Sequence, residues 1–480
     1  MNTKLLKQKI LDLAIRGKLT QQLKSDGTAA DLLKEICDRT QEKTSLRAKR
    51  GNPSPQTIIP LDKSEAPFEI PANWEWVRLG DVAKKITDGT HHSPVNLETG
   101  DFMYVTAKNI KDDGIHLENI TYVSSDTHKE IFARCNPEKG DVLLIKDGAT
   151  TGVVTVNNLE EPFSLLSSVA LLKLGSSIES WYLAFVIRST LFNQMIRSQM
   201  KGVGITRVTL KQIESFAFPL PPLAEQQRIV AKIEEAFAEI DAIEKNKELL
   251  KNHIKQARQK ILDLAIHGKL VPQNKSDESA SVLLERITRD NPHYEKLENE
   301  PFEIPENWAW CKLGNIAEIN PKNKLDDDLE VSFIPMNLIE AGYSNRHGQE
   351  SKSWKDVKKR FTHFAENDVA LAKISPCFEN KKSAIMRNLK NGYGAGTTEL
   401  FIFRPLDVMV VNYLLWIFKS DNFIQAGTGN FSGVVGQQRL SREVVENYPI
   451  PLPPLNEQFR IIAKIEELFS TLDQMERNLV

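Results

Sequence analysis

PLPPLAEQQRIVAKIEEAF, at Pro219–Phe237, returns later in the chain as PLPPLNEQFRIIAKIEELF, at Pro451–Phe469. Fifteen of the nineteen positions are identical, and the two copies lie 232 residues apart. A long stretch that returns at a fixed interval indicates duplicated structural units. The 480-residue chain is therefore predicted to contain two copies of one unit.

Two other motifs are also duplicated. KQKILDLAIRGKL at Lys7–Leu19 matches RQKILDLAIHGKL at Arg258–Leu270 at eleven of thirteen positions. PFEIPANWEWVRLGDVA at Pro67–Ala83 matches PFEIPENWAWCKLGNIA at Pro301–Ala317 at eleven of seventeen. The offset between the two copies is 251 residues for the ILDLAI motif, 234 for the PFEIP motif and 232 for the PLPPL motif. Because the offset falls between the first and second of these motifs, the linker before the first PFEIP motif is longer than the linker before the second.

The intervals between the motifs predict the domain organisation. Trp74–Pro221 and Trp308–Pro453 span 148 and 146 residues but diverge in sequence, which indicates one scaffold with two different surfaces. The predicted segments are the first part of a conserved helix with its tail (1–37), a polar and basic linker (38–66), a first globular domain (67–222), a central conserved helix (223–272), a tail and linker (273–300), a second globular domain (301–454) and the last part of a conserved helix (455–480).

The central helix shows a heptad pattern. Ten of eleven positions spaced alternately by four and three residues are apolar, which is typical of a coiled coil. These positions are Ile229, Ile233, Ala236, Ile240, Ile243, Lys247, Leu250, Ile254, Ala257, Ile261 and Leu264.

The second copy of this helix is divided between the ends of the chain. By the repeat offsets, Val480 corresponds to Glu248 and Met1 corresponds to Asn252. The two terminal segments therefore supply one composite helix, and the repeat is circularly permuted. The expected fold class is mixed α+β, with two globular domains separated by two long antiparallel coiled-coil helices around an approximate two-fold axis. Each apolar seam is expected to cover the other.

Composition limits the class of protein. The chain is 41% hydrophobic and 26% charged, as in ordinary soluble proteins. Its four cysteines form no CxxC pair, which predicts reduced thiols. Neither a signal peptide nor a long apolar span is found, so a cytoplasmic location without membrane contact is expected. With 62 Lys and Arg against 64 Asp and Glu, any binding of nucleic acid must depend on local arrangement or on a partner.

The order of the motifs carries a family resemblance. Each divergent interval follows P-x-x-W-x-W-x-x-L-G (Pro71–Gly80 and Pro305–Gly314) and precedes PLPPL-x-EQ (Pro219–Gln226 and Pro451–Gln458). With the ILDLAIxGKL helix ends, this arrangement resembles the specificity subunit of type I restriction–modification systems over essentially the whole chain.

The resemblance implies a noncatalytic DNA-recognition subunit. In that family the divergent domains are target-recognition domains, each reading one half of a split, asymmetric site in double-stranded DNA. The helices space these domains and dock two adenine-specific methyltransferase subunits, and restriction (motor) subunits complete the complex. No cofactor is expected on this chain, whereas S-adenosylmethionine and ATP with Mg²⁺ are expected on the partners.

Candidate DNA contacts come from polar loops and basic clusters. Lysine and arginine suit guanine edges, asparagine suits adenine, and glycine permits close approach to phosphate. Solvated turns and faces are the alternative for each of these residues. The candidates are Thr87, His91, His92, Lys108, Asn109, Lys146, Gly202 and Arg207 in the first domain, and Lys359, Arg360, Lys381, Lys382 and Arg439 in the second.

Two other classes of protein remain as alternatives. A single-chain methyltransferase or nuclease needs a cofactor motif, but Asn291-Pro292-His293-Tyr294 differs by one residue from the Asn-Pro-Pro-Tyr/Phe form of amino-methyltransferases. The chain also has no G-x-x-x-x-G-K-[ST] sequence, which argues against an ATP motor, and the glycine run Gly392–Gly396 lacks the context of a phosphate loop. A bivalent scaffold that binds proteins or glycans fits the balanced charge but does not account for the order of the motifs.

Overall fold

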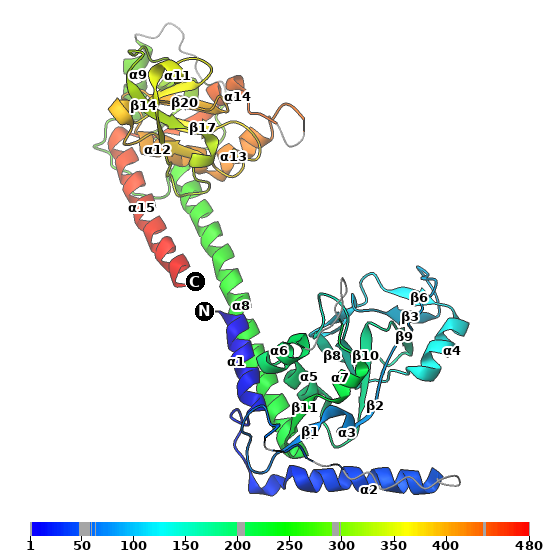
Figure 1. The fold of residues 1–480 in the computed structure, drawn as a ribbon. Coiled ribbons are helices and arrows are strands. Elements are labelled where there is room, and N and C mark those ends of the chain that lie inside the picture. The colour runs from blue at the N-terminus through cyan, green and yellow to red at the C-terminus, as the bar shows by residue number, and fades with distance from the viewer. Residues whose placement is uncertain are drawn as a thin grey trace. The chain divides into compact units, whose positions relative to one another are not determined.

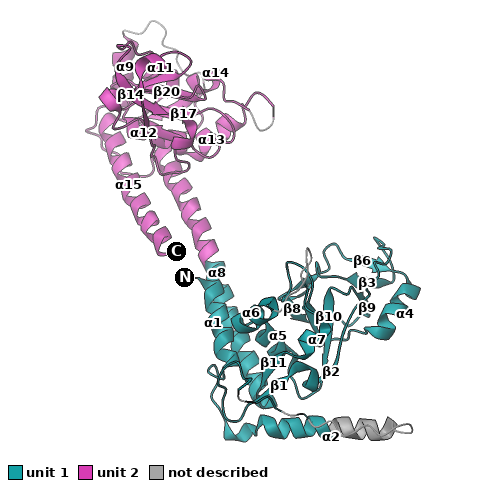
Figure 2. Ribbon diagram, viewed as in Figure 1, with its two compact units in different colours: residues 1–246 teal, residues 247–480 magenta. Residues whose placement is uncertain are grey.

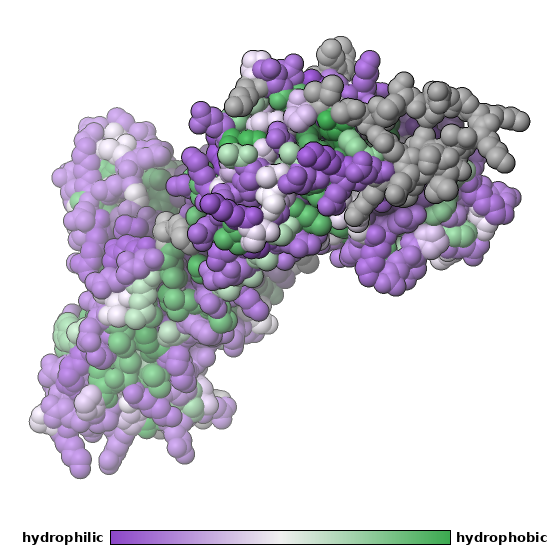
Figure 3. Space-filling model, turned by 90° about the horizontal axis from the view of Figure 1, so that it is seen from below, coloured by the Kyte–Doolittle hydropathy of each residue, from purple (hydrophilic) through white to green (hydrophobic). Residues whose placement is uncertain are grey.

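The computed structural model describes residues 2–47, 58, 60–62, 64–198, 207–289, 297, 299–434 and 438–479. The chain divides into two compact units, Met1–Asn246 and Lys247–Val480 (Figure 2). Both mix helices with small sheets, which confirms the predicted α+β class. On the face of the molecule drawn in Figure 3, polar residues predominate, with smaller apolar areas between them.

In the first unit, helices flank a set of short strands (Figure 1). The helices are α1 (Thr3–Ile15), η1 (Lys24–Asp26), α2 (Ala29–Arg47), α3 (Leu79–Val82), α4 (Ser125–Arg134), α5 (Ser180–Arg188), α6 (Thr190–Ser198), α7 (Leu210–Glu214) and the first part of α8 (Leu223–Ile266). The strands are β1 (Glu75–Arg78), β2 (Ala83–Asp88), β3 (Phe102–Val105), β4 (Ile110–Lys111), β5 (Gly114–Ile115), β6 (Thr121–Val123), β7 (Val142–Ile145), β8 (Val154–Val156), β9 (Phe163–Leu165), β10 (Val169–Leu174) and β11 (Ala217–Leu220).

The second unit repeats much of this order. Its helices besides the end of α8 are α9 (Ala280–Thr288), α10 (Leu313–Ile316), η2 (Met336–Leu338), α11 (Trp354–Val357), η3 (Lys390–Gly392), α12 (Val411–Lys419), α13 (Asp421–Thr428), α14 (Arg442–Glu446) and α15 (Leu455–Asn478). Its strands are β12 (Ala309–Lys312), β13 (Ala317–Ile319), β14 (Glu330–Ile334), β15 (Glu350–Ser353), β16 (Thr362–Ala365), β17 (Val369–Ala372), β18 (Ser383–Ile385), β19 (Tyr393–Gly396), β20 (Leu400–Pro405) and β21 (Pro449–Leu452).

The two units share a framework of sheets. The antiparallel pair β1–β11 joins the two motifs that flank the first domain, with Trp76 opposite Pro219, and β12–β21 sets Trp310 opposite Pro451 in the same way. A four-stranded sheet follows in each unit, with the order β2-β10-β7-β8 in the first and β13-β20-β17-β18 in the second. The third sheets differ: β6-β3-β9 has three strands, whereas β15-β14-β19-β16 has four.

The long helices pack antiparallel within each unit. In the first, Thr3 of α1 bonds Glu244 of α8, and Lys7 forms an ion pair with Asp241. In the second, Arg258 of α8 forms an ion pair with Glu476 of α15. Figure 1 shows α1 and α15 beside the parts of α8 that belong to their own units.

The heptad seam is buried only toward its ends. Ile233 and Ile254 are buried, but Ile243 is 48% exposed and Leu250 is 40% exposed. The expectation that each seam covers the other was therefore wrong for the middle of α8. The contacts fit this difference, because Thr3 at the start of α1 lies opposite Glu244, so Ile243 is at the end of the contact between α1 and α8.

Helix α2 also differs from the prediction. It continues to Arg47, ten residues into the segment assigned as linker from Asp38. Residues 38–47 contain neither proline nor glycine, so nothing in this stretch ends a helix.

Candidate nucleic-acid interface and helix junctions

The Glu-Gln pair of the duplicated motif lies at a buried junction in the first unit. Glu225, in the first turn of α8, accepts hydrogen bonds from the indole N–H of Trp74 (2.9 Å) and from the amide of Gln22 (2.7 Å). Gln226 accepts from the backbone N–H of Glu179 and donates to the carbonyl of Pro221. Both side chains are inaccessible to solvent.

The second unit repeats this junction. Glu457 accepts from Gln273 at 2.6 Å, and burial raises the pKa of Glu457. Gln458 accepts from the backbone N–H of Val410 and donates to the carbonyl of Pro453. These residues are thus retained in both copies because they join helix and domain, and they are too buried to form a docking surface.

An exposed part of each helix is also identical in the two copies. Lys232 and Glu235 form an ion pair of 2.7 Å on α8, and Lys464 and Glu467 form one of 2.8 Å on α15. Glu234 and Glu466 occupy equivalent exposed positions between them. Exposed ion pairs add little to stability, so the fold does not require this identity.

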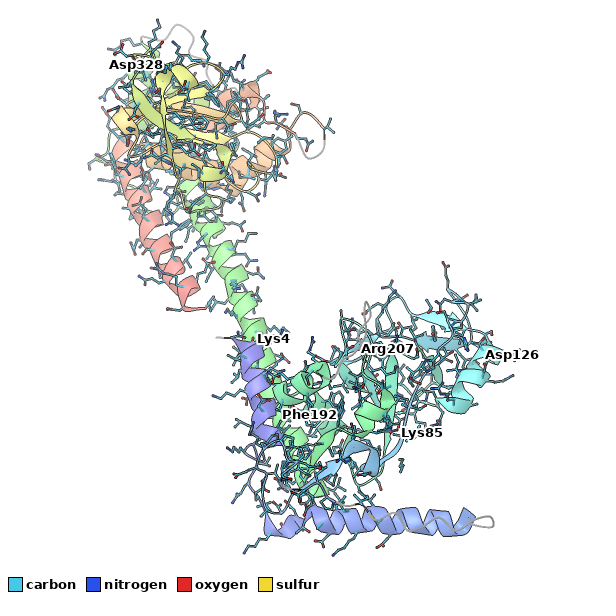
Figure 4. All side chains as sticks on the ribbon, viewed as in Figure 1. Lys4, Lys85, Asp126, Phe192, Arg207 and Asp328 are labelled. Atoms are coloured by element: carbon cyan, nitrogen blue, oxygen red, sulfur yellow. The ribbon has the colours of Figure 1, made fainter. Side chains whose placement is uncertain are left out.

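Several predicted site residues lie at one edge of the four-stranded sheet in the first unit, where strands β2 and β7 end. Thr87 lies at the end of β2, and Lys146 directly follows β7. Arg207, labelled in Figure 4, pairs with Asp147 in an isolated bridge, and the neighbouring Val208 donates its N–H to the carbonyl of Lys146. Segments separated by about 120 residues in sequence, from Thr87 to Arg207, therefore meet at this edge.

An ion cluster surrounds Asp88 at the same edge. Its buried carboxylate forms ion pairs with Arg134 and with the Nζ of Lys146 (3.4 Å), and the Nε2 of His91 lies 3.2 Å from the same carboxylate. Lys146 is buried and also contacts Asp147 at 3.4 Å. Arg134 and His91 remain more than half exposed, which leaves them accessible to a ligand. Arg134 is not among the residues predicted from the sequence, because no motif marks the last residue of α4.

Other predicted residues of the first domain have different surroundings. Asn109 is buried, where its side-chain oxygen accepts from the backbone N–H of Thr106 and its amide donates to the carbonyl of His116. Both ends of the amide stabilise a turn, and the contact of Asn109 with a base stays a prediction. Thr87 is also buried, whereas Lys108 and His92 are exposed. Gly202 lies outside the described residues.

The equivalent edge of the second unit has different charges. Arg439 pairs with Ile374 in an isolated bridge, as Arg207 does with Asp147. Its guanidinium also donates to the carboxylate of Glu399 through Nε (3.0 Å) and Nη2 (2.9 Å). Lys373 donates its backbone N–H to the carbonyl of Glu399. One backbone scaffold thus presents different side chains in the two units, as predicted.

The side chains of Lys381 and Lys382 form hydrogen bonds within the second unit. The Nζ of Lys381 donates to Tyr343 (2.8 Å), to the carbonyl of Lys419 (2.9 Å) and to Asp421 (2.6 Å). Lys382 donates to the carbonyl of Met336. The ammonium group of Lys381 already has three acceptors, and its contact with a base stays a prediction.

The basic cluster near α11 is largely paired. Lys355 and Lys358 form ion pairs with Asp328 and Asp327, of which Asp328 is labelled in Figure 4. Lys359 and Arg360 are exposed. These last two are the members of the cluster that remain candidates for contact with DNA.

No group of three or more His, Cys, Asp or Glu suited to a metal ion occurs within the described residues. The four cysteines are free thiols, and burial raises the pKa of Cys135 to about 12. None of the helices that the structure describes has the length and apolar composition needed to cross a bilayer.

Comparison with known proteins gives the family. The model for the type I restriction modification DNA specificity domain matches residues 71–252 and 305–479. The EcoAI and EcoEI specificity subunits of Escherichia coli type I restriction enzymes are 49% and 44% identical to this chain, each over 47% of it. These alignments cover only 41% and 40% of the two relatives. The Escherichia coli EcoKI specificity subunit is 21% identical over 86% of the chain and 85% of its own length.

The fold also has a solved counterpart. The crystal structure of the HsdS subunit from Thermoanaerobacter tengcongensis superposes with a TM-score of 0.54. It covers 87% of this chain and 94% of its own, at 18% identity. Since the family model matches most of the chain and covers a globular domain and a long-helix segment in each half, this protein belongs to the family of type I restriction–modification DNA specificity subunits.

Proposed function

We propose that this chain is the noncatalytic subunit that supplies DNA sequence specificity to a type I restriction–modification complex. Each globular domain reads one half of a bipartite, asymmetric site in double-stranded DNA. The observation that carries the proposal is the shared sheet edge with unlike side chains, Asp88 and Arg134 in one unit and Glu399 and Arg439 in the other. A common scaffold with different base-reading groups suits two different half-sites.

The long helices set the spacing of the domains and dock two adenine-specific methyltransferase subunits. Docking is supported by an exposed helix face that is the same in both copies. It carries Lys232 and Glu235 on α8, and Lys464 and Glu467 on α15. Two equal faces fit two equal partners.

Catalysis belongs to the partners. S-adenosylmethionine binds the methyltransferase subunits, and ATP with Mg²⁺ binds the restriction subunits. The balanced charge of this chain, 62 basic against 64 acidic residues, fits a complex in which the partners supply much of the phosphate neutralisation.

Methylation mapping of the host genome tests the proposed reading of DNA. We expect one bipartite motif in the host and its loss when the gene is deleted. Replacing Trp308–Pro453 with the corresponding interval of a relative should change one half of the motif and leave the other half intact. Simultaneous change of both halves would show that the domains do not read independently.

Docking is tested by native mass spectrometry of the reconstituted complex. Wild type should bind two methyltransferase subunits, and Glu234→Arg with Glu235→Arg should lower this number to one by charge repulsion at a single face. Glu239→Arg is the control, because it makes the same kind of charge change on the same helix at a position that differs between the copies. A limit of one partner for wild type would contradict the proposal.

A further inference from the structure

The ion cluster at Asp88 holds one exposed arginine in a defined position. The carboxylate of Asp88 is almost wholly buried and contacts Nη2 of Arg134, while 53% of the arginine side chain remains exposed. His91 lies beside it, with its Nε2 3.3 Å from the same Nη2. The buried Lys146 contacts the other carboxylate oxygen, which keeps the anion in place.

The main chain of Arg134 is fixed as well. Arg134 is the last residue of α4, and its carbonyl accepts a hydrogen bond of 2.7 Å from the Nζ of Lys85 on β2. Figure 4 labels Lys85 together with Asp126, near the start of this helix. Buried Ile131 anchors α4 to the domain, as does buried His128, which bonds Ser164. Both ends of the arginine side chain are therefore restrained.

The shared fold does not require this cluster. A different buried ion pair, Asp141 with Lys173 at 2.8 Å, recurs in the second unit as Asp368 with Arg404 at the same distance. Asp88 has no such counterpart, because the second unit carries Asn320-Pro321-Lys322 at this point after β13. A charge cluster confined to one unit is expected where the two units differ in what they read.

Arginine that is fixed at one nitrogen can present its remaining donors as a rigid fork. A guanine offers O6 and N7 in the major groove as a matching pair of acceptors. We propose that Arg134 reads a guanine in the half-site of the first domain and that Asp88 is its positioning residue. This inference rests on the proposed function and extends it to one base and one residue.

The test measures base preference at every position of both half-sites. The full-length chain, reconstituted with the methyltransferase subunits of its host, selects binding sites from a randomised DNA pool. Arg134→Lys keeps the charge but loses the fork, so the preference for guanine at one position of the first half-site should fall about tenfold. The second half-site is an internal control and should be unchanged.

Asp88→Asn should weaken the preference at the same position, because the guanidinium then loses its anchor. In the Arg134→Lys background it should add no further loss, since Asp88 acts through Arg134. A purely structural role would instead weaken all positions of that half-site together. Asp141→Asn is the matched control, because it breaks the shared ion pair and should lower the melting temperature without altering the pattern of preferences.

The outcomes separate this inference from the proposed function. If wild type selects no bipartite motif, the proposed function fails. If wild type selects such a motif and Arg134→Lys retains every preference in the first half-site, the assignment of Arg134 alone is overturned.

Discussion

A fully buried lysine shows how charge is accommodated inside the second unit. Lys419, the last residue of α12, donates to the carbonyls of Gly342 (2.6 Å) and Lys381 (2.9 Å). Neither acceptor is a carboxylate, and Asp421 binds Lys381 instead. Burial, together with the neighbouring charge of Lys381, lowers the pKa of Lys419 to about 7.

This pKa predicts a pH dependence of stability. In the unfolded chain the lysine titrates near 10.5, so the unfolded state binds more protons between pH 7 and 10.5. Wild type should therefore gain stability relative to Lys419→Met as the pH rises from 7 to 9, by at most about 1.4 kcal/mol per pH unit.

Thermal unfolding at pH 7, 8 and 9 measures this difference. Lys269→Met, at an exposed position, is the control and should differ from wild type equally at all three values. A constant difference between wild type and Lys419→Met would mean that the charged lysine is as stable inside the unit as in water.

At the scale of structural elements, each of the duplicated helices α1 and α8 is followed by a position that requires glycine. Gly17 and Gly268 follow α1 and α8 with φ of +63° and +65°. A Cβ atom at either position would lie 2.3 Å from the ring of Pro71 or Pro305. The G of ILDLAIxGKL thus serves both the turn out of the helix and its contact with the next motif.

Replacing Gly17 by alanine should destabilise the fold by more than the left-handed backbone angle alone would. Gly17→Ala should lower the free energy of unfolding by about 2–5 kcal/mol. The left-handed backbone contributes about 1–2 kcal/mol of this loss, and overpacking against the proline ring contributes about 1–3 kcal/mol. Gly140→Ala is the matched control, because Gly140 has φ of +89° and a Cβ atom added there would meet nothing within 4 Å. Chemical denaturation measures both, and equal losses would show that the proline contact contributes nothing.

In the whole molecule, the proposed spacing role of the helices can be tested by lengthening them. Seven residues inserted after Lys247 and seven appended at Val480 add one heptad to each long helix and preserve the facing of both seams. Each helix gains about 10.5 Å, which corresponds to about three base pairs. The inserted position lies between Ile243 and Leu250, where the seam is least buried.

Methylation mapping should then find the same half-sites with about three more unread base pairs between them. Insertion into α8 alone should instead mismatch the seams and lower the melting temperature. An unchanged gap in the doubly lengthened protein would show that the helices do not set the spacing.

The sequence by itself determined the duplication, the permuted order, the length and seam of α8, and the family. Each of these depends on local periodicity or on long identical motifs, which are visible along a single chain. Even the divergence of the two surfaces could be predicted, because the intervals between the motifs differ while their lengths agree.

Only the tertiary structure decided what individual side chains do. The duplicated Glu225-Gln226 pair is buried at a junction between helix and domain, and the side chains of Asn109 and Lys381 form intramolecular hydrogen bonds. Arg134 became a candidate because Asp88, 46 residues away in sequence, holds it at the edge of the sheet. Hydrogen bonds and ion pairs join residues that are distant in sequence, and their partners leave no periodic trace in the chain.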